Sequence, residues 1–454
     1  MYAWLFRHLL FPAYESGLRR RRTLKYLQQL EEQQWGSLEG VRELQWRQLL
    51  ALVRHAEAHV PFYRERMRRA GLTARAINSP EDFRRLPPLT KADVRAHARE
   101  LIADNISSRA LHWSATGGST GEPIRFAYDH NSYEWRVAVA ARADRWAGWD
   151  WGERQFYIWG RALRPEPRLM LLKKRLHNRL LNMRVLSAFD FTDAVLKDYA
   201  RQLNAFRPCV VVGYTNALYE FARFCKARGL NIWQPKGIIP TAERLYDYQR
   251  ELLHQVFRAG VFDRYGCREV MNIAAECERH EGLHVCADHL YLELECDGRP
   301  AMPGELGEVL VTDLHNYAMP FIRYRNGDLA VSAARPCSCG RGLPLLACVE
   351  GRVLDMIVAP DGRYVPGEFF PHLLKDYPGI ERYQIYQGPD YRVTVRIMPG
   401  PDFTRSHLEE IRRLITGQLG PSANVDVVLV DDIPRTEGGK LRVTISEVRA
   451  QYDR

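Results

Sequence analysis

Four short apolar runs, separated by helical stretches, constrain the fold of this chain more than any other feature. The runs QFYIWG, CVVVGY, GIIP and VFDRYG begin at Gln155, Cys209, Gly237 and Val261. Apolar runs of this length, bounded by turn residues, are typical of strands that are buried on both faces. Helices between such strands favour parallel pairing. The sequence therefore predicts an α/β fold whose mostly parallel sheet is flanked by helices.

The segments on either side of this core follow other patterns. Residues 24–70 carry apolar side chains at helical spacing, so we expect a helical extension over about the first 100 residues. After Gly282, HLYLELE and GEVLVTDL alternate apolar and polar residues, which predicts antiparallel strands. After Arg352, a strand, a helix over Ser406–Gln418 and the strand VDVVLV predict a small α+β region. A chain of 454 residues exceeds one ordinary core, and we predict two domains, 1–353 and 354–454.

The charge balance narrows the range of partners without choosing one. The 65 Lys and Arg residues exceed the 55 Asp and Glu residues, which gives a formal net charge of +10. Such a balance suits nucleic acid, an anionic membrane surface or acidic small molecules. The longest like-charged block is the short run Arg19–Arg22, so the chain shows no basic tail for nucleic acid. We therefore predict no nucleic-acid partner.

Cysteine usage and the first residues bear on location. The nine cysteines are an odd number spread over a long chain, which favours a reducing cytoplasm over a secreted disulfide framework. The opening MYAWLFRHLLFPAYESGLRRRR is apolar first and basic afterwards, the reverse of a secretory signal. Trp4, Leu5, Leu9 and Phe11 fall near one side of a helix. We favour a helix packed on the protein body and keep an interfacial membrane helix as the alternative.

The stretch SATGGSTGEPIRFAYD, which begins at Ser114, concentrates small hydrogen-bonding residues ahead of a strand-like run. Glycines such as Gly117 and Gly121 have no Cβ, so backbone N–H groups there can approach a ligand closely. Ser119 and Thr120 add hydroxyl groups. Such a loop can bind phosphate oxygens, although an ordinary surface turn has the same composition.

Cys277, His284, Cys337 and Cys339 form a separate set of candidate metal ligands. Two Cys in a C-x-C segment, one further Cys and one His suit a tetrahedral structural zinc ion. C-x-C is less common at zinc sites than C-x-x-C, and buried inert thiols are the alternative interpretation. Cys286 is a substitute ligand.

Four further stretches accompany the glycine-rich loop: TAER, DRYGCREV, IRYRNGDLA and PRTEGGKLR, which begin at Thr241, Asp263, Ile322 and Pro434. In this order and at roughly this spacing they resemble the motifs of the adenylate-forming superfamily. The segments HVPFYRER, GYTNALYEFA and CSCGR are similar to those of its phenylacetate–CoA ligase-like branch, and within it to CapK-type capsular polysaccharide biosynthesis proteins. The resemblance covers nearly the whole chain.

The resemblance implies an acyl-CoA synthetase-like fold with a small β-barrel-like part, in which residues 354–454 form a small mobile lid. It implies ATP-dependent activation of a carboxylic acid, an aromatic one being one option, to an acyl adenylate with release of pyrophosphate. Transfer to coenzyme A or another nucleophile would follow. The implied cofactors are ATP/AMP, Mg²⁺, coenzyme A and a structural Zn²⁺ at the Cys/His set. The implied partners are a small acid and an acceptor, and a homodimer is one open oligomeric state.

The resemblance also implies roles for single residues. Lys440 is expected to contact the reacting carboxylate, Glu269 to hold Mg²⁺, Arg268 to contact the α-phosphate and Asp328 to accept the ribose hydroxyls. The implied nucleotide contacts are Ser119, Thr120, Gly121, Ala242, Glu243, Asp263, Tyr265, Gly266, Asp328 and Arg352. The implied acyl pocket contains Tyr214, Thr215 and Trp135, although aromatic residues at such positions are more often plain core.

The sequence departs from the superfamily pattern in three places. In the glycine-rich loop, the superfamily usually has a Lys beside the Pro, whereas here the nearest cation is Arg125. Before Glu269, Arg268 stands where a Thr or Ser is usual. At the hinge, Leu354 stands where an Asp is usual. The altered hinge and the missing loop Lys favour one alternative, a catalytically weak nucleotide-binding scaffold of a polysaccharide-assembly system. A second alternative is an adenylyltransferase that acts on a hydroxyl group. A nucleic-acid-binding protein that uses the zinc site and the basic surface is a more distant one.

Overall fold

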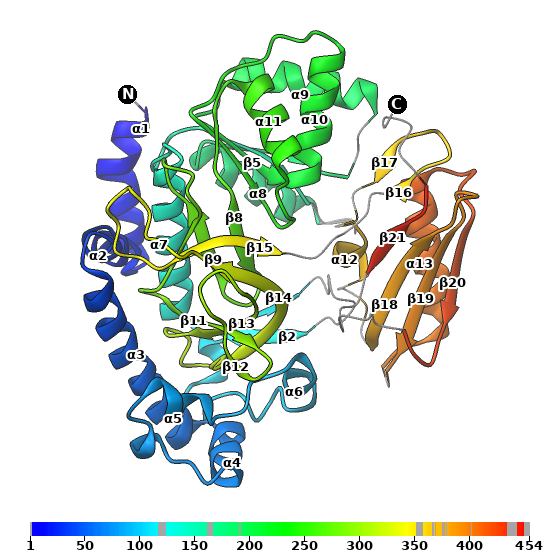
Figure 1. Ribbon diagram of the computed structural model, residues 1–454. Helices are drawn as coiled ribbons and strands as arrows, with labels where there is room; N and C mark the ends of the chain where they lie inside the picture. The colour runs from blue at the N-terminus through cyan, green and yellow to red at the C-terminus, as the bar shows by residue number, and fades with distance from the viewer. Residues whose placement is uncertain are drawn as a thin grey trace. The chain divides into compact units, whose positions relative to one another are not determined.

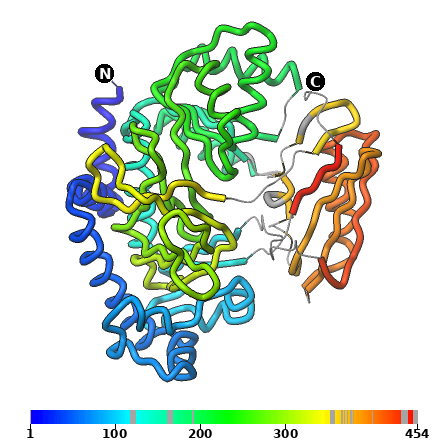
Figure 2. Tube along the Cα trace, in the orientation of Figure 1, coloured from blue at the N-terminus to red at the C-terminus, as the bar shows by residue number. Residues whose placement is uncertain are grey.

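The computed structural model divides into two compact units, each discontinuous in sequence. Unit 1 is Met1–Ala115, Ile124–Glu153 and Phe262–Gly351, and unit 2 is Thr116–Pro123, Arg154–Val261 and Arg352–Arg454. Figure 1 labels their helices and strands, and Figure 2 traces the backbone. The structure describes residues 2–116, 124–160, 167–189, 192–350, 357–365, 367, 369–374, 377, 379–400, 402–433 and 443–448.

Unit 1 begins with the predicted helical extension. Several of its helices start at a side chain that accepts a hydrogen bond from the first turn, as at Ser37, Ser79 and Thr90. Thr90 and Asp93 form a reciprocal capping box at the start of α6. The α-helices are α1 (Tyr2–Leu5), α2 (Thr23–Gln33), α3 (Leu38–His59), α4 (Pro61–Arg69), α5 (Pro80–Arg84), α6 (Lys91–Ala96) and α7 (His130–Trp146). The π-helices are η1 (Phe6–Leu10) and η2 (Ala13–Leu18), and the 3₁₀ turns are η3 (Ala74–Ala76) and η4 (Ser108–Ala110).

The first residues pack on unit 1 through one side only. Phe6 and Phe11 are buried, and the Phe11 ring stacks on Trp151 with 4.1 Å between centroids. Trp4 and Leu9 on the same segment are exposed. Among the described helices, none is both long and apolar enough to cross a membrane.

The strands of unit 1 pair antiparallel, as the alternating patterns predicted. In the large sheet the order is β12-β11-β13-β14-β15-β10-β9-β8, and β1 and β2 form a separate pair. The strands are β1 (His112–Ala115), β2 (Arg125–Tyr128), β8 (Arg264–Cys267), β9 (Met271–Glu276), β10 (Leu283–Val285), β11 (Leu290–Cys296), β12 (Arg299–Pro300), β13 (Leu306–Asp313), β14 (Tyr324–Ser332) and β15 (Leu345–Glu350).

Unit 2 contains the parallel strands expected from the apolar runs. Their order is β7-β6-β5-β3-β4, every pair is parallel, and each residue of β5 is buried. This confirms the α/β fold. The elements are β3 (Gln155–Trp159), α8 (Arg168–Leu180), β4 (Met183–Ser187), α9 (Asp193–Phe206), β5 (Val210–Tyr214), α10 (Thr215–Ala227), β6 (Gly237–Thr241), α11 (Asp247–Phe257) and β7 (Gly260–Val261).

The C-terminal part of unit 2 is the predicted small α+β region. A four-stranded sheet in the order β20-β19-β18-β21 lies against α13, whose bounds Arg405–Leu419 match the expected helix within one residue at each end. The remaining elements are β16 (Ile357–Val358), β17 (Tyr364–Val365), α12 (Phe369–Leu374), β18 (Ile380–Gln387), β19 (Val393–Pro399), β20 (Val425–Leu429) and β21 (Thr444–Ser446). The expected domain boundary at 353/354 falls outside the described residues and stays a prediction.

Gly266 permits the tight approach of β8 to β9. The register shifts between Tyr265 and Gly266, and Met271, which pairs with Cys267, has a φ of +63°. A Cβ on Gly266 would lie 2.1 Å from the carbonyl oxygen of Met271, which is backbone and cannot turn aside. The hairpin that carries Arg268 and Glu269 therefore requires glycine at this position.

We predict that Gly266→Ala lowers the free energy of unfolding by about 2 kcal/mol or more, because the hairpin must open to admit the methyl group. Gly17→Ala is the matched control, since a Cβ there would meet nothing within 4 Å. It should change stability by less than about 1 kcal/mol. Urea unfolding of both variants measures the difference, and equal stabilities would contradict the packing argument.

Candidate functional site

The glycine-rich loop is framed by a pair of antiparallel strands. Ala115 at the end of β1 pairs with Arg125 at the start of β2, so the two ends of the loop are held together. The loop itself lies outside the described residues. Five of the site residues predicted from the sequence lie outside the described residues: Ser119, Thr120 and Gly121 in this loop, and Arg352 and Lys440 elsewhere in the chain. Their roles remain predictions.

Asp328 is fixed by two side chains of unit 1. The hydroxyl of Tyr265 in β8 donates to Asp328 Oδ2 over 2.9 Å, and Asn326 Nδ2 donates to the same oxygen over 2.8 Å. Asn326 Nδ2 also lies 2.8 Å from the Tyr265 hydroxyl. Burial, and next the negative charge of Asp328, raise the pKa of Tyr265 far above its usual range, so the phenol stays protonated and remains a donor. The sequence-predicted pair Tyr265 and Asp328 is thus brought together.

Glu269 is a buried carboxylate held by a second tyrosine. It lies in the turn between β8 and β9, only 5% exposed, and Tyr324 donates its hydroxyl to Glu269 Oε1 over 2.7 Å. Its neighbour Arg268 is exposed. Carboxylate oxygens are the ligands that Mg²⁺ prefers, so Glu269 has the chemistry expected of it. Asp263 lies directly before β8, and its backbone N–H donates to Glu276 Oε2 over 2.9 Å.

Tyr324 and Asn326 position Glu269 and Asp328, and the motif IRYRNGDLA had predicted a role for Asp328 alone. A signal was present, because successive side chains of a strand point to opposite faces. Tyr324, Asn326 and Asp328 are two residues apart in β14, and all three are buried. A strand that buries a Tyr, an Asn and an Asp on one face must pair their polar groups.

The unit 2 residues expected near the nucleotide form their own network. Glu243 accepts hydrogen bonds from Asn216 N at 2.7 Å and Asn216 Nδ2 at 3.1 Å, at the first turn of α10. Thr215 donates its hydroxyl to the carbonyl oxygen of Glu243 over 3.1 Å. Burial raises the pKa of Glu243 to about 7. Ala242 is exposed and has a φ of +71°, a rare conformation for a residue with a Cβ. Glu243 therefore orients the start of α10.

The two aromatic residues expected in an acyl pocket, Trp135 and Tyr214, each pack against other aromatic rings. Trp135 in α7 is buried, with Tyr26 stacked at 4.3 Å and His315 at 3.9 Å between ring centroids. Its indole thus packs in the core of unit 1. Tyr214 at the end of β5 is also buried, and its ring lies 4.7 Å from that of Trp159 in unit 2. An acyl pocket at these residues stays a prediction.

The four candidate zinc ligands converge in unit 1. Cys277 follows β9, His284 lies in β10, and Cys337 and Cys339 lie between β14 and β15. The Cys277 and Cys337 sulfurs are 3.7 Å apart, and Cys339 Sγ lies 3.3 Å from His284 Nε2. All four ligand atoms lie within 4.8 Å of one another. A tetrahedral ion with Zn–S bonds of about 2.3 Å separates two sulfurs by about 3.7 Å.

The electrostatic surroundings of this cluster also suit a metal. Burial, followed by the charge of Arg341, lowers the pKa of His284 to about 4, so the imidazole is neutral and able to ligate. The backbone N–H groups of Arg279 and Arg341 donate to Cys277 Sγ and Cys339 Sγ over 3.5 and 3.4 Å. Such donors stabilise thiolates, the form that binds zinc.

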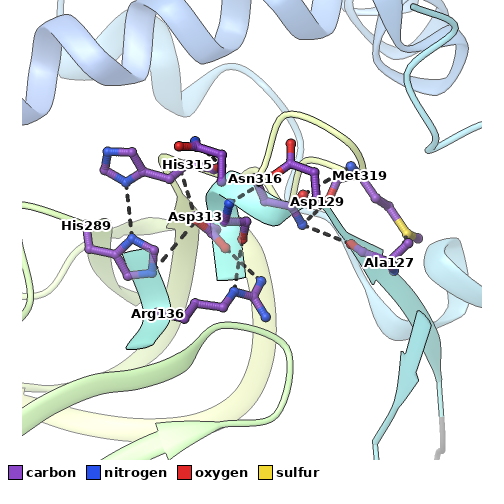
Figure 3. Close-up of polar contacts among 10 residues, drawn as sticks. Ala127, Asp129, Arg136, His289, Asp313, His315, Asn316 and Met319 are labelled. Carbon is purple, nitrogen blue, oxygen red and sulfur yellow. Dashed lines mark hydrogen bonds and ion pairs between the residues drawn. The ribbon is translucent and has the colours of Figure 1, made fainter. Parts of the chain in front are cut away.

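A second cluster, which no sequence pattern singled out, lies beneath α7. His289, Asp313 and His315 are buried, and Figure 3 shows the contacts among them. The Nδ1 atoms of His289 and His315 are 3.1 Å apart, and Arg136 Nη2 lies 2.8 Å from Asp313 Oδ2. Burial lowers the pKa of His289 to about 4 and that of His315 to about 3. We interpret the group as a neutral histidine pair beside a buried Arg–Asp ion pair.

We predict that this histidine pair makes unit 1 sensitive to acid. A histidine in the unfolded chain titrates near pH 6.5, whereas the two native histidines stay neutral down to about pH 4. Between these pH values the unfolded state therefore binds more protons than the native state, and the free energy of unfolding should fall as the pH drops from 6.5 toward 4. The double variant His289→Gln, His315→Gln should lose less stability over that range than the wild type. Urea unfolding at several pH values measures the difference.

The control for the acid effect is His59→Gln, because that imidazole is well exposed, beside Asp104. It should leave the acid-dependent loss of stability nearly as it is in the wild type. An identical loss in the double variant and the wild type would show that other groups cause the acid sensitivity.

Comparisons with known proteins agree with this architecture. Residues 357–447 match the family model of the CapK C-terminal domain. The chain is 25% identical over 438 residues to phenylacetate–coenzyme A ligase of Thermus thermophilus, covering 89% of this chain and 96% of the relative. It is 23% identical to protein CapK of Staphylococcus aureus, covering 90% and 89%.

Solved structures show the same fold. A crystal structure of 2-hydroxyisobutyryl-CoA ligase with 2-HIB-AMP and CoA, in the thioesterification state, superimposes with a TM-score of 0.61 at 20% identity and covers 91% of each chain. Another of this ligase, in the postadenylation state, gives a TM-score of 0.59 at 19% identity, again with 91% coverage of each chain. The resemblance read from the motifs is therefore confirmed: over most of its length this chain is similar to phenylacetate–CoA ligases and to CapK, and it has the fold of the solved 2-hydroxyisobutyryl-CoA ligase.

Proposed function

We propose that the protein is an AMP-forming acid–coenzyme A ligase. It would join a carboxylate to the α-phosphate of ATP, release pyrophosphate, and then pass the acyl group to the thiol of coenzyme A with loss of AMP. The observation that carries this proposal is the pair of buried, tyrosine-held carboxylates in unit 1, Asp328 and Glu269. Both fall in motifs that resemble the superfamily, and the relatives named above are coenzyme A ligases or CapK.

Each carboxylate has a task that its surroundings support. Asp328 can accept hydrogen bonds from the ribose hydroxyls, while Tyr265 and Asn326 keep it in one orientation. Glu269 would hold Mg²⁺, which would neutralise charge on the phosphate oxygens. The exposed Arg268 beside it can contact the α-phosphate, where a cation stabilises the charge that develops during attack.

The remaining assignments complete the proposal. The backbone N–H groups and hydroxyls of Ser119, Thr120 and Gly121 would bind the phosphates of the leaving pyrophosphate. Lys440 would stabilise the attacking carboxylate and the α-phosphate. Arg352 would contact the ribose. A cytoplasmic location belongs to the proposal, because the nine cysteines, all among the described residues, form no disulfide and a reducing compartment keeps them in that state.

We predict that Glu269→Gln lowers pyrophosphate release from ATP and acid by at least about 100-fold, because phosphate charge is left uncompensated. Tyr324→Phe should lower it about tenfold, since Glu269 then loses the donor that orients it. Tyr14→Phe is the control, because that ring is exposed, and its rate should equal that of the wild type. A panel of aromatic and aliphatic acids, with and without coenzyme A, serves as substrate.

The same assay separates the alternatives. Wild-type rates in Glu269→Gln would remove the magnesium assignment. Nucleotide binding without pyrophosphate release from any acid would favour the scaffold of a polysaccharide-assembly system. A stable adenylated product formed from a hydroxyl compound would favour an adenylyltransferase.

We further propose that Cys277, His284, Cys337 and Cys339 bind a structural zinc ion. With four protein ligands the ion would have no open position, so it would stabilise the fold without entering the reaction. The Cys337–Cys339 segment leads directly to Arg341, which packs on Trp35 and Trp146. Gly342, the next residue, comes so close to Gly36 that a Cβ would lie 1.9 Å from the carbonyl oxygen of Gly36. The ion would thereby fasten this segment to the residues that follow α2.

We predict that the purified protein contains about one equivalent of zinc and that Cys337→Ser removes it and lowers thermal stability. Cys348→Ser is the control, because Cys348 lies in β15 outside the cluster, and its metal content should equal that of the wild type. Elemental analysis and thermal unfolding measure both effects. Metal-free wild-type protein of unchanged stability would show that the cluster is a set of inert thiols.

A further inference from the structure

Helix α8 of unit 2 exposes apolar side chains along its whole length. Leu169, Leu172, Leu176 and Leu180 are exposed by 64%, 62%, 68% and 46%. At 3.6 residues per turn these four leucines fall within an arc of about 80° on one side of the helix. We call these four residues the leucine stripe. Most amphipathic helices of a folded protein turn such a stripe toward the core, whereas this one lies in solvent.

The opposite side of α8 is the one that meets the protein. Asn178, on that side, is half-buried, and every other described side chain of the helix is exposed. The helix contacts β4, the strand at the edge of the parallel sheet. The leucine stripe therefore points away from unit 2, and its exposure follows from the orientation of the helix on the sheet.

The charge on this segment has a single sign. Residues 167–189 contain six Lys and Arg and no Asp or Glu. Around the helix, Arg175 and Arg179 flank the leucine stripe on one side and Lys173 on the other, and all three are exposed. An apolar stripe bordered by cations is the pattern of a helix that lies in the interface of an anionic bilayer.

We propose that α8 docks unit 2 on an anionic membrane surface, with the leucine stripe at the acyl-chain boundary and the basic side chains on the lipid phosphates. A second copy of the chain fits the charge less well, because two α8 helices would bring cations against cations. Nucleic acid would pair with the cations but leave four leucines uncovered. The proposal goes beyond the ligase activity and does not depend on it.

Co-sedimentation of the full-length protein with vesicles tests the proposal. The protein should bind vesicles that mix phosphatidylcholine with phosphatidylglycerol, bind phosphatidylcholine alone more weakly, and dissociate at high salt. The variant Leu169→Gln, Leu172→Gln, Leu176→Gln should bind at least about tenfold more weakly, because it loses the apolar contact. The variant Lys173→Gln, Arg175→Gln should lose about fivefold in affinity for each charge removed.

The N-terminal segment offers a matched control, because it too exposes leucines. Leu5, Leu9 and Leu10 are exposed by 38%, 54% and 42%, and their replacement by Gln should leave vesicle binding unchanged. If these replacements abolish binding and the leucine-stripe variant does not, the membrane site is at the N-terminus and the proposal fails. The proposal also fails if the wild-type protein does not bind anionic vesicles.

Two further measurements complete the test. Light scattering of the wild type and the leucine-stripe variant reports association between copies. A dimer that the variant converts to a monomer, without vesicle binding by the wild type, would assign the stripe to a second copy and overturn the proposal. Pyrophosphate release without vesicles should be the same in both proteins, which shows that the variant is folded. Since vesicle binding needs no turnover, an inactive protein that still binds would overturn only the proposed function.

Discussion

The approach of β8 to β14 is the constraint on which the rest of unit 1 depends. In the sheet order, β9, β10 and β15 lie between these two strands. Even so, Tyr265 in β8 bonds to Asp328 in β14, and Tyr324 in β14 bonds to Glu269 just after β8. Side chains four strands apart can meet only if the sheet curls strongly, as the sequence-based expectation of a barrel-like part requires. The bulge at Gly266 lets β8 turn in this way.

Two buried ion pairs fix the position of α7 on the sheet of unit 1. Arg136 pairs with Asp313 at the end of β13, and Arg142 pairs with Asp288 just before β11. All four side chains are buried, so the loss of one partner would leave an uncompensated charge that costs about 3–5 kcal/mol. Because β11 and β13 are antiparallel and Leu290 pairs with Asp313, both ion pairs hold α7 at the same end of the β11–β13 pair. The neutral histidines at 289 and 315 fill the space beneath the helix without adding further charge.

Local structure was largely predictable. The capping box at Thr90, the helix near Ser406 and the parallel strands at Gln155 and Cys209 depend on short-range propensity and on the period of apolar residues. The four candidate zinc ligands were predicted from residue type, spacing and the family resemblance, and they do converge. The pattern could not reveal that Trp135 packs between two other rings, because a buried aromatic residue has the same spacing whether it lines a core or a pocket.

The sequence by itself determined the element types and the α/β class, and it predicted the two carboxylates on which the proposed activity depends. Only the tertiary structure decided how those carboxylates are held, because the donors Tyr265 and Tyr324 lie about 60 residues from their acceptors in the chain. It also decided which way α8 turns its leucines. An amphipathic pattern specifies that a helix has an apolar side, whereas the neighbouring strands determine whether that side faces the core or the solvent.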